Sequence, residues 1–270
     1  MKKIIREVNK EKGVIQVTIA DERWYWKSVQ DKKQLKSIDT FVPSVTWICG
    51  YYPKGIHFYK WLAEKGWDEA EAIKSAAGDK GSKVHSAIVD LIDGKEVKMD
   101  SKYLNQSSEK DEELTLEEYE AIMNFVDFYS SLESVKTINR EFTVFSDKYN
   151  YAGTVDWLVE INGELWLIDF KTSKSIWTEY ELQVSSYGEE VKNSLKLKST
   201  PKLGIVQIGY PYNKRGWKLT EIENKFDLFL VTQKLWEQEN KDKQPPVKDY
   251  PEVLKLIKKV VENKPKEIKQ

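Results

Sequence analysis

The sequence predicts an α/β protein in which helices flank a central mixed β-sheet, preceded by a largely helical N-terminal half. The first observation is the order of hydrophobic patterns from residue 115 onward, which is helix, three strands, helix, strand, helix. This order fits helices packed around a mixed sheet. The second is composition, because 40% hydrophobic and 12% aromatic residues in a chain of 270 supply a substantial core.

The N-terminal half begins with a predicted hairpin over residues 14–30, where Val, Ile, Trp and Tyr alternate with polar residues around a break at Ala20-Asp21. A helical region follows, in which Thr115 and Glu118 form a capping-box pattern. The predicted helices cover residues 44–49, 56–65, 68–92 and 115–132, with a polar loop over 98–113.

The second half changes character, because β-branched and aromatic runs replace the helical spacing. Strands are predicted over residues 141–146, 151–161, 164–172 and 203–210, and helices over 178–194 and 225–240. Pro245-Pro246 indicates a linker before a short amphipathic helix over residues 251–263.

Bulk charge and cysteine content exclude several classes. The 43 basic and 44 acidic residues leave a net charge of −1, so any polyanion must be bound by a local basic groove. The single cysteine, Cys49, excludes an intrachain disulfide and a four-thiolate iron–sulfur cluster. With no apolar run of about 18 residues and a charged start, we expect no membrane association and a cytoplasmic location.

The strongest turn signal is Asn162-Gly163, which typically forms a two-residue hairpin loop. Such a loop pairs Ile161 with Glu164, so that opposing residue numbers sum to 325. Asp156 and Asp169 also sum to 325, which predicts that they face each other with Cβ atoms about 4.5–5.5 Å apart. Lys171 follows two residues after Asp169 and points to the same face.

Both faces of this hairpin are apolar, which predicts that it is buried. Leu158 opposes Leu167 on the acidic face, and on the other Trp157, Val159 and Val155 oppose Ile168, Trp166 and Phe170. Two buried carboxylates repel each other and need a proton, a cationic side chain or a metal ion. Hard oxygen ligands suit Mg²⁺ or Mn²⁺. The alternative is that Lys171 only neutralises Asp169.

Five segments in order resemble the PD-(D/E)XK nuclease superfamily, and more narrowly the branch with the RecB nuclease domain, the CRISPR-associated adaptation exonuclease and the mitochondrial genome maintenance exonuclease. They are Pro43-Ser44-Val45-Thr46, Gly81-Ser82-Lys83-Val84-His85, Gly153-Thr154-Val155-Asp156, Ile168-Asp169-Phe170-Lys171-Thr172-Ser173 and Gln183-x-x-x-Tyr187. The resemblance spans residues 43–188. It implies a restriction-endonuclease-like core over residues 136–240, after an N-terminal region (1–135) carrying the histidine motif and before a C-terminal linker and helix (241–270).

The resemblance also implies residue roles in phosphodiester hydrolysis. Asp156, Asp169, the Phe170 carbonyl and His85 would bind Mg²⁺ or Mn²⁺, which polarises a phosphoryl oxygen and activates water. Lys171 would orient the attacking water and stabilise developing charge. Gln183 and Tyr187 would position the DNA strand or the metal shell.

Each secondary residue has a structural alternative. A lone helical histidine such as His85 is usually structural, and Tyr187 lies on an apolar stripe that fits the core. Gln183 lies one turn before Tyr187 and can act with it. Glu141, at the expected start of the first core strand, is a candidate catalytic residue or the surface ion-pair partner of Arg140. Relatives that carry an iron–sulfur cluster differ from this chain, for which no such cluster is expected.

The expected function is a DNA exonuclease acting on single strands or ends. A structure-specific endonuclease and a non-catalytic nucleic-acid-binding protein of the same fold are the alternatives. Recombination or replication proteins are the expected partners, and a phage role suits the small stand-alone architecture. We expect the DNA to bind in a groove over the sheet, walled by Trp61, Trp67, Lys74, Lys80 and Lys83. The alternative is that the lysines are solvated and the tryptophans are packed in the helical core.

Overall fold

A computed structural model describes residues 3–9, 14–19, 22–31 and 36–243 of the chain. The predicted linker at Pro245-Pro246 and the predicted helix over residues 251–263 lie outside the described residues.

A five-stranded mixed sheet forms the centre of the molecule, in the order β11-β10-β9-β8-β7. Its β9–β10 pair is parallel and the other pairs are antiparallel. The strands are β7 (Val135–Ser146), β8 (Tyr151–Ile161), β9 (Glu164–Lys171), β10 (Lys202–Ile208) and β11 (Trp217–Ile222). The predicted mixed α/β class is therefore confirmed, whereas β11 was not predicted.

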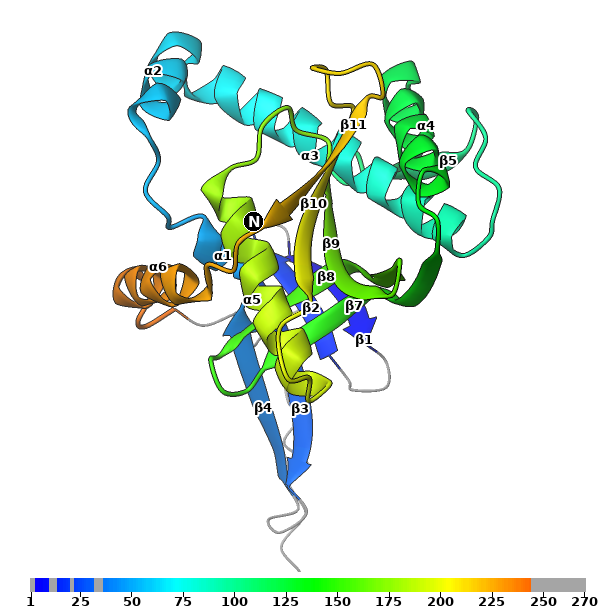
Figure 1. The fold of residues 1–270 in the computed structure, drawn as a ribbon. Coiled ribbons are helices and arrows are strands. Elements are labelled where there is room, and N and C mark those ends of the chain that lie inside the picture. Colours follow the sequence, from blue (N-terminus) through cyan, green and yellow to red (C-terminus); the bar gives the residue numbers. More distant parts are fainter. Residues whose placement is uncertain (1–2, 10–13, 20–21, 32–35, 244–270) are drawn as a thin grey trace, which may run out of the picture.

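Helices cover both faces of this sheet, and each face has its own hydrophobic cluster. Leu158 and Leu167 pack with α5 (Thr178–Ser194), α6 (Phe226–Glu239) and α1 (Val45–Cys49). Trp157 and Ile168 pack with α3 (Trp67–Ile92) and α4 (Leu116–Ser130). In Figure 1, α5 crosses in front of the sheet, while α3 and α4 lie at its upper end. The predicted alternation of Leu158/Leu167 against Trp157/Ile168 is confirmed by this division.

The helices of the N-terminal half agree with the prediction. Ser44 caps α1, with its hydroxyl accepting a hydrogen bond from the Trp47 backbone N–H at 3.1 Å. Thr115 and Glu118 form the capping box of α4. Between α1 and α3, a further helix, α2, covers Ile56–Lys65.

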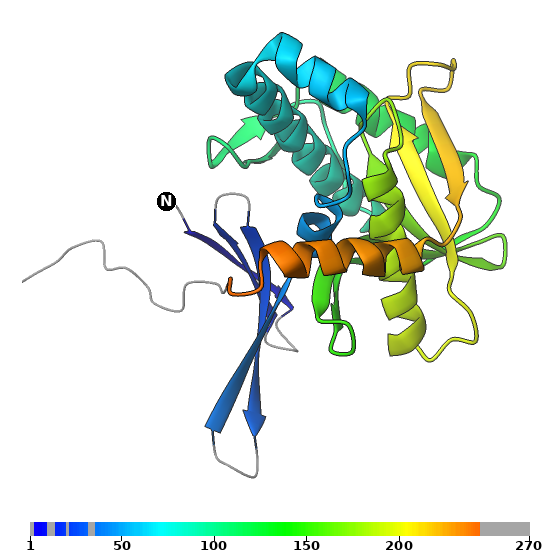
Figure 2. The ribbon, with the colours of Figure 1, turned by 90° about the vertical axis from the view of Figure 1, so that its left-hand side faces the viewer.

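The strands of this half differ from the prediction. The expected hairpin is present as β2 (Val14–Ile19) and β3 (Glu22–Asp31), but β1 (Lys3–Asn9) and β4 (Lys36–Pro43) extend it to a four-stranded sheet. In Figure 2, β3 and β4 reach beyond the rest of the molecule. The predicted polar loop is also wrong, because β5 (Lys102–Asn105) and β6 (Lys110–Glu113) form a small hairpin there. Backbone pairing outweighs the poor strand propensity of these polar segments.

The predicted register of the β8–β9 hairpin is confirmed. Asn162 and Gly163 both have positive φ, 51° and 81°, as a tight two-residue turn requires. Pairs run from Ile161↔Glu164 to Trp157↔Ile168, so opposing numbers sum to 325. The ladder ends there, one pair before Asp156 and Asp169. Val155, beyond this end, packs with Leu158 and Leu167 in the hydrophobic cluster that faces α5, called the α5-side cluster below. Phe170 belongs to the cluster on the other face, so the expected place of Val155 opposite Phe170 is wrong.

Strand β7 begins earlier than predicted, so Glu141 lies within it and not at its start. Arg140 pairs with Trp157 and Phe142 with Val155, which puts Glu141 at the register position of Asp156. Glu141 has a φ of +41°, an unfavourable backbone conformation for a residue with a side chain.

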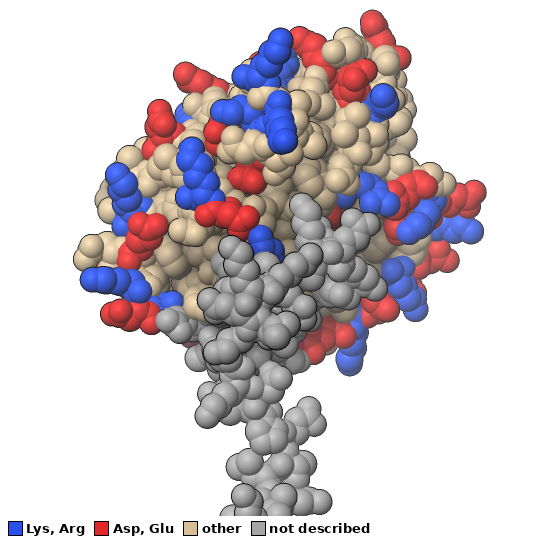
Figure 3. Space-filling view, turned by 90° about the horizontal axis from the view of Figure 1, so that it is seen from below, with Lys and Arg blue, Asp and Glu red and all other residues tan. Residues whose placement is uncertain are grey.

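In the part of the chain that the structure describes, no helix is long and apolar enough to cross a membrane. On the face seen from below, Lys and Arg side chains are interspersed with Asp and Glu (Figure 3). This mixture agrees with the net charge of −1.

Candidate active site

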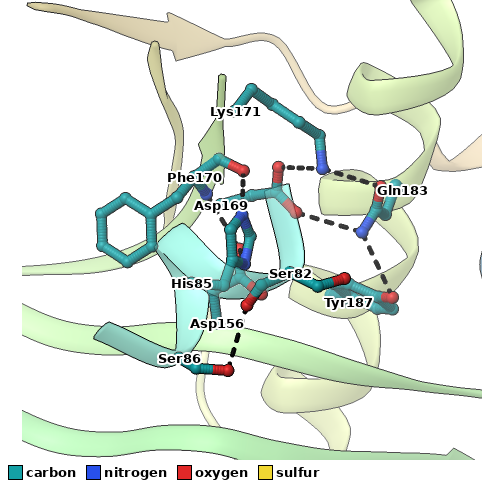
Figure 4. Close-up of polar contacts among 9 residues, drawn as sticks. All are labelled: Ser82, His85, Ser86, Asp156, Asp169, Phe170, Lys171, Gln183 and Tyr187. Carbon is teal, nitrogen blue, oxygen red and sulfur yellow. Dashed lines mark hydrogen bonds and ion pairs between the residues drawn. The ribbon is translucent and has the colours of Figure 1, made fainter. Parts of the chain in front are cut away.

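The candidate site lies where β8 and β9 separate. One pair beyond the end of the ladder, the Asp156 side chain takes over as partner of β9, because the Phe170 backbone N–H donates to Asp156 Oδ2 at 2.9 Å. The Asp156 carboxylate is thereby fixed close to that of Asp169, and its charge acts to raise the pKa of Asp169. Figure 4 shows both among the side chains described below.

Asp169 is the most deeply buried of the charged residues here, at 1% exposure. Its Oδ1 accepts a hydrogen bond from Gln183 Nε2 at 3.0 Å, and its Oδ2 lies 2.6 Å from Lys171 Nζ. The Oδ2 contact is an ion pair without hydrogen-bond geometry. Burial raises the pKa of Asp169 to about 6, against the opposing charge of Lys171. A single lysine therefore leaves this carboxylate incompletely compensated.

Lys171 is held by three neighbours. Besides Asp169, its ammonium donates to Gln183 Oε1 at 3.3 Å and lies 4.7 Å from the centre of the Tyr180 ring. Burial acts to lower the pKa of Lys171, but the charges of Asp169 and Asp156 outweigh it and the pKa is raised. The lysine is therefore a fixed cation, 16% exposed and within reach of a ligand.

His85 on α3 supplies the partner of the second carboxylate. Its Nδ1 lies 3.5 Å from Asp156 Oδ2, and its Nε2 donates to the Phe170 carbonyl at 2.8 Å (Figure 4). Burial acts to lower the pKa of His85, but the Asp156 charge outweighs it and the pKa is raised. The pKa of Asp156 is lowered, because His85, Lys171 and the Phe170 N–H together outweigh its burial. These two groups form an ion pair.

Gln183 and Tyr187 approach from α5 as a unit. Gln183 Nε2 donates to Asp169 and, at 3.4 Å, to the Tyr187 hydroxyl. Tyr187 is 2% exposed and packs in the α5-side cluster, so it has a core role as well as this polar contact. Its ring needs Gly153, because a Cβ on Gly153 would lie 2.7 Å from the Tyr187 hydroxyl oxygen. This close approach accounts for glycine in the segment leading to Asp156.

The donor set fits a hard divalent cation. Among the described residues, no three His, Cys, Asp or Glu side chains are grouped so that they could hold a metal ion by themselves. Magnesium usually needs only one or two carboxylates and keeps several waters. Asp156, Asp169 and the Phe170 carbonyl supply such oxygens. His85 Nε2 and the Phe170 oxygen lie 2.8 Å apart, joined by a hydrogen bond, so both would lie beside an ion held by the two carboxylates. His85 would release its Nε2 proton on binding.

The sequence-predicted residues are therefore brought together, with one exception. His85, Asp156 and Phe170 contact one another, Lys171 and Gln183 contact Asp169 and each other, and Gln183 also contacts Tyr187. Glu141 is exposed, and its charge acts on Arg140, whose main partner is Asp93. Its catalytic role stays a prediction.

Two neighbours of the site were not predicted. Tyr180, in the first turn of α5, has its ring beside the Lys171 ammonium. Gln207 of β10 pairs with Lys171 in the parallel register and donates to the Ser173 carbonyl at 3.1 Å, which holds the loop after β9. The feature of the sequence that could have pointed to Gln207 is a glutamine among the apolar residues of a predicted strand.

Among the predicted residues that precede β7 in the sequence, some have structural roles and others have no role assigned by their contacts. Ser44 is the cap of α1. Lys83 is buried in an ion pair with Glu118 at 2.8 Å, so its expected place in a DNA groove is wrong. Lys80 pairs with Glu117, and Trp67 is 68% exposed.

Neither a scan against models of known protein families nor a search of curated proteins finds a match.

Proposed function

We propose that this chain is a divalent-metal-dependent deoxyribonuclease with a PD-(D/E)XK core. The observation that carries the proposal is the pair of carboxylates at the end of the β8–β9 ladder, the buried Asp169 and the half-buried Asp156, with Lys171 in contact with Asp169. A buried carboxylate with a pKa raised to about 6 favours a further cation beside it.

Asp156, Asp169, the Phe170 carbonyl and His85 would hold Mg²⁺ or Mn²⁺, which supplies Lewis-acid activation of the phosphoryl group and a more acidic water. Lys171 remains protonated, so it stabilises negative charge on a bound phosphate and orients the nucleophile by hydrogen bonding. Gln183 bridges Asp169 and Lys171 and keeps these two groups in a fixed relation.

DNA is proposed as the substrate, with single strands or ends attacked, from the resemblance of the five segments. A structure-specific endonuclease built on the same residues is the second candidate. A non-catalytic nucleic-acid-binding protein is less well supported, because the complete set of Asp156, Asp169 and Lys171 is retained in contact geometry. Recombination or replication proteins are the proposed partners, within the cytoplasm.

Digestion of single- and double-stranded DNA, labelled at either end, tests the proposal with Mg²⁺, Mn²⁺ or EDTA. We expect cleavage with either ion and none in EDTA or with Asp169→Asn. Mononucleotide release from a labelled end indicates an exonuclease, and internal fragments indicate the endonuclease. Metal-dependent binding without cleavage by the wild-type chain would contradict the enzymatic proposal.

A further inference from the structure

A groove of about 780 Å³ opens beside the candidate site, between α2, the segment before it and the start of α5. Its volume is typical of a small-molecule or cofactor site. Five aromatic rings line it, from Tyr52, Phe58, Trp61, Trp177 and Tyr180. A groove lined mainly by aromatic rings is suited to flat, π-rich ligands.

The groove is continuous with the candidate site through Tyr180. This ring lines the groove, and its centre lies 4.7 Å from Lys171 Nζ, which is ion-paired with Asp169. Trp177, at the N-terminal end of α5, belongs to the same lining. A polymer with one phosphate at Lys171 would therefore have its adjoining nucleotides within the groove.

Helix α2 has an apolar surface that the described chain does not cover. None of its ten residues is buried. Phe58 is 39% exposed and Tyr59 is 54% exposed, and Trp177 across the groove is 57% exposed. Large exposed aromatic side chains gathered in one place mark a binding site more often than a passive surface.

Two lysines at the groove give it the cations that a polyanion requires. Lys54 and Lys74 line it, the first in an ion pair with Glu179 and the second with Glu71. Glu179 is the acidic residue of the lining. Phosphate groups can compete for both ammonium groups, while bases stack on the rings between them.

We infer that this groove binds the unpaired bases of single-stranded DNA next to the phosphate that is cleaved, an inference that rests on the proposed nuclease function. A base can stack on a side chain only when it has left its neighbours, so a duplex cannot occupy the rings without melting. Stacking is tolerant of sequence, because every base has a π-face. The groove therefore selects single strands by their unstacked bases.

This groove corrects the surface expected from the sequence. Trp61 and Lys74 belong to it, whereas Trp67 is absent from its lining and Lys83 is buried elsewhere. Trp67 is 68% exposed, more than Trp177, so it provides a matched control for the loss of one exposed tryptophan.

The test is equilibrium binding of a fluorescent 16-nucleotide DNA by the full chain in EDTA, measured by anisotropy. The variants are Trp177→Ala, Phe58→Ala, Trp177→Phe and the control Trp67→Ala, each with its thermal unfolding recorded. We expect the first two to bind at least about fivefold more weakly, the order of one lost stacking contact. Trp177→Phe should largely restore affinity, and Trp67→Ala should match the wild type.

Duplex DNA and RNA of the same sequence complete the test, and we expect the single-stranded DNA to bind most tightly. Equal affinity of Trp177→Ala and the wild type would overturn the groove, even if the wild type cleaves DNA with Mn²⁺. Tighter binding of duplex or RNA would overturn single-stranded DNA as its ligand. Conversely, a wild type that binds single strands through Trp177 but never cleaves would leave the groove intact and contradict the nuclease.

Discussion

Two lysines in the described part of the chain, Lys83 and Lys171, are paired with buried carboxylates, and the surroundings of the two pairs differ. Lys83 and Glu118 lie 2.8 Å apart with side chains 4% and 5% exposed. Glu118 also accepts the Thr115 N–H, and Lys83 donates to the Glu113 carbonyl. Each charge here has one fixed opposite charge and a backbone partner, so the pair is complete as a structural element that ties α3 to the start of α4.

The pair of Lys171 and Asp169 belongs to a larger group with a second carboxylate, Asp156. The compensation of Asp156 comes from His85, whose ordinary pKa lies near neutral pH and is raised here. Considering β8 and β9 alone, Lys171 is the only cation that can compensate the two carboxylates. In the structure, His85 is a second one. The pair of Lys83 and Glu118 thus has permanent partners, whereas the group around Asp169 contains a proton, on His85, that a metal ion can replace.

The largest effect is expected from removing either carboxylate of the candidate site. Asp156→Ala and Asp169→Ala should each abolish Mn²⁺ binding and DNA cleavage together, because the oxygen donors act as one set. Calorimetric titration with Mn²⁺ and a cleavage assay on the same preparations measure both. Unchanged Mn²⁺ affinity in Asp169→Ala would remove the basis of the proposed metal site.

The second effect concerns the structural pair. Lys83→Ala should lower the free energy of unfolding by about 3–5 kcal/mol, because Glu118 is left as an uncompensated buried charge. Urea denaturation measures this loss. The matched double variant Lys83→Met/Glu118→Gln should recover most of it, because glutamine removes the charge and keeps an acceptor for the Thr115 N–H. A loss below about 1 kcal/mol would mean that this pair is not more important to stability than a surface pair.

The third effect separates the two lysines by function. Lys171→Ala should bind Mn²⁺ and DNA but cleave about a hundredfold more slowly, a typical loss for a positioned catalytic group. Single-turnover cleavage at saturating metal measures the chemical step. A near-normal cleavage rate would mean that Lys171, like Lys83, has only a structural role.

The smallest effect is a pH dependence of stability in the metal-free chain. The pKa of Asp169 is about 6 when folded and 3.8 in its ordinary state, so the folded chain retains a proton that the unfolded chain has lost. The contribution of the Asp169 proton to the free energy of unfolding is fully present below about pH 4. As the pH rises through 6 this contribution, roughly 1–3 kcal/mol, is lost. Urea denaturation in EDTA, compared with Asp169→Asn, isolates it. Parallel pH profiles for the two chains would contradict the raised pKa.

The parts predicted correctly from the sequence were those with a local cause. Asn162-Gly163 determined the register of β8 and β9, and Thr115 with Glu118 marked the start of α4. Among the strands that were missed, β5 and β6 pair with each other without a strong hydrophobic pattern of their own. In β6, Lys110–Glu113, every residue is charged, and hydrogen bonding to β5 determines its conformation.

The site was predictable only in part, for the same reason. Asp156, Asp169 and Lys171 follow from one hairpin, whereas the contacts of His85 and Gln183 depend on how α3 and α5 pack on the sheet. Local spacing does not determine which ring nitrogen of His85 faces Phe170 or which residues Gln183 bridges. The division of one integrated domain into the regions 1–135, 136–240 and 241–270 stays a prediction.

The close approach of Tyr187 to Gly153 has a consequence for substitution. A glycine within a strand ordinarily costs about 0.5–1 kcal/mol relative to alanine, so its replacement is a usual route to a more stable sheet. At this position the gain is not available, because a methyl group would displace the buried Tyr187 ring, whose burial contributes about 1.5–3 kcal/mol. Tyr187 contacts Gln183, and Gln183 contacts Asp169. The lack of a side chain at Gly153 in β8 thus helps to determine the position of the Asp169 carboxylate in β9.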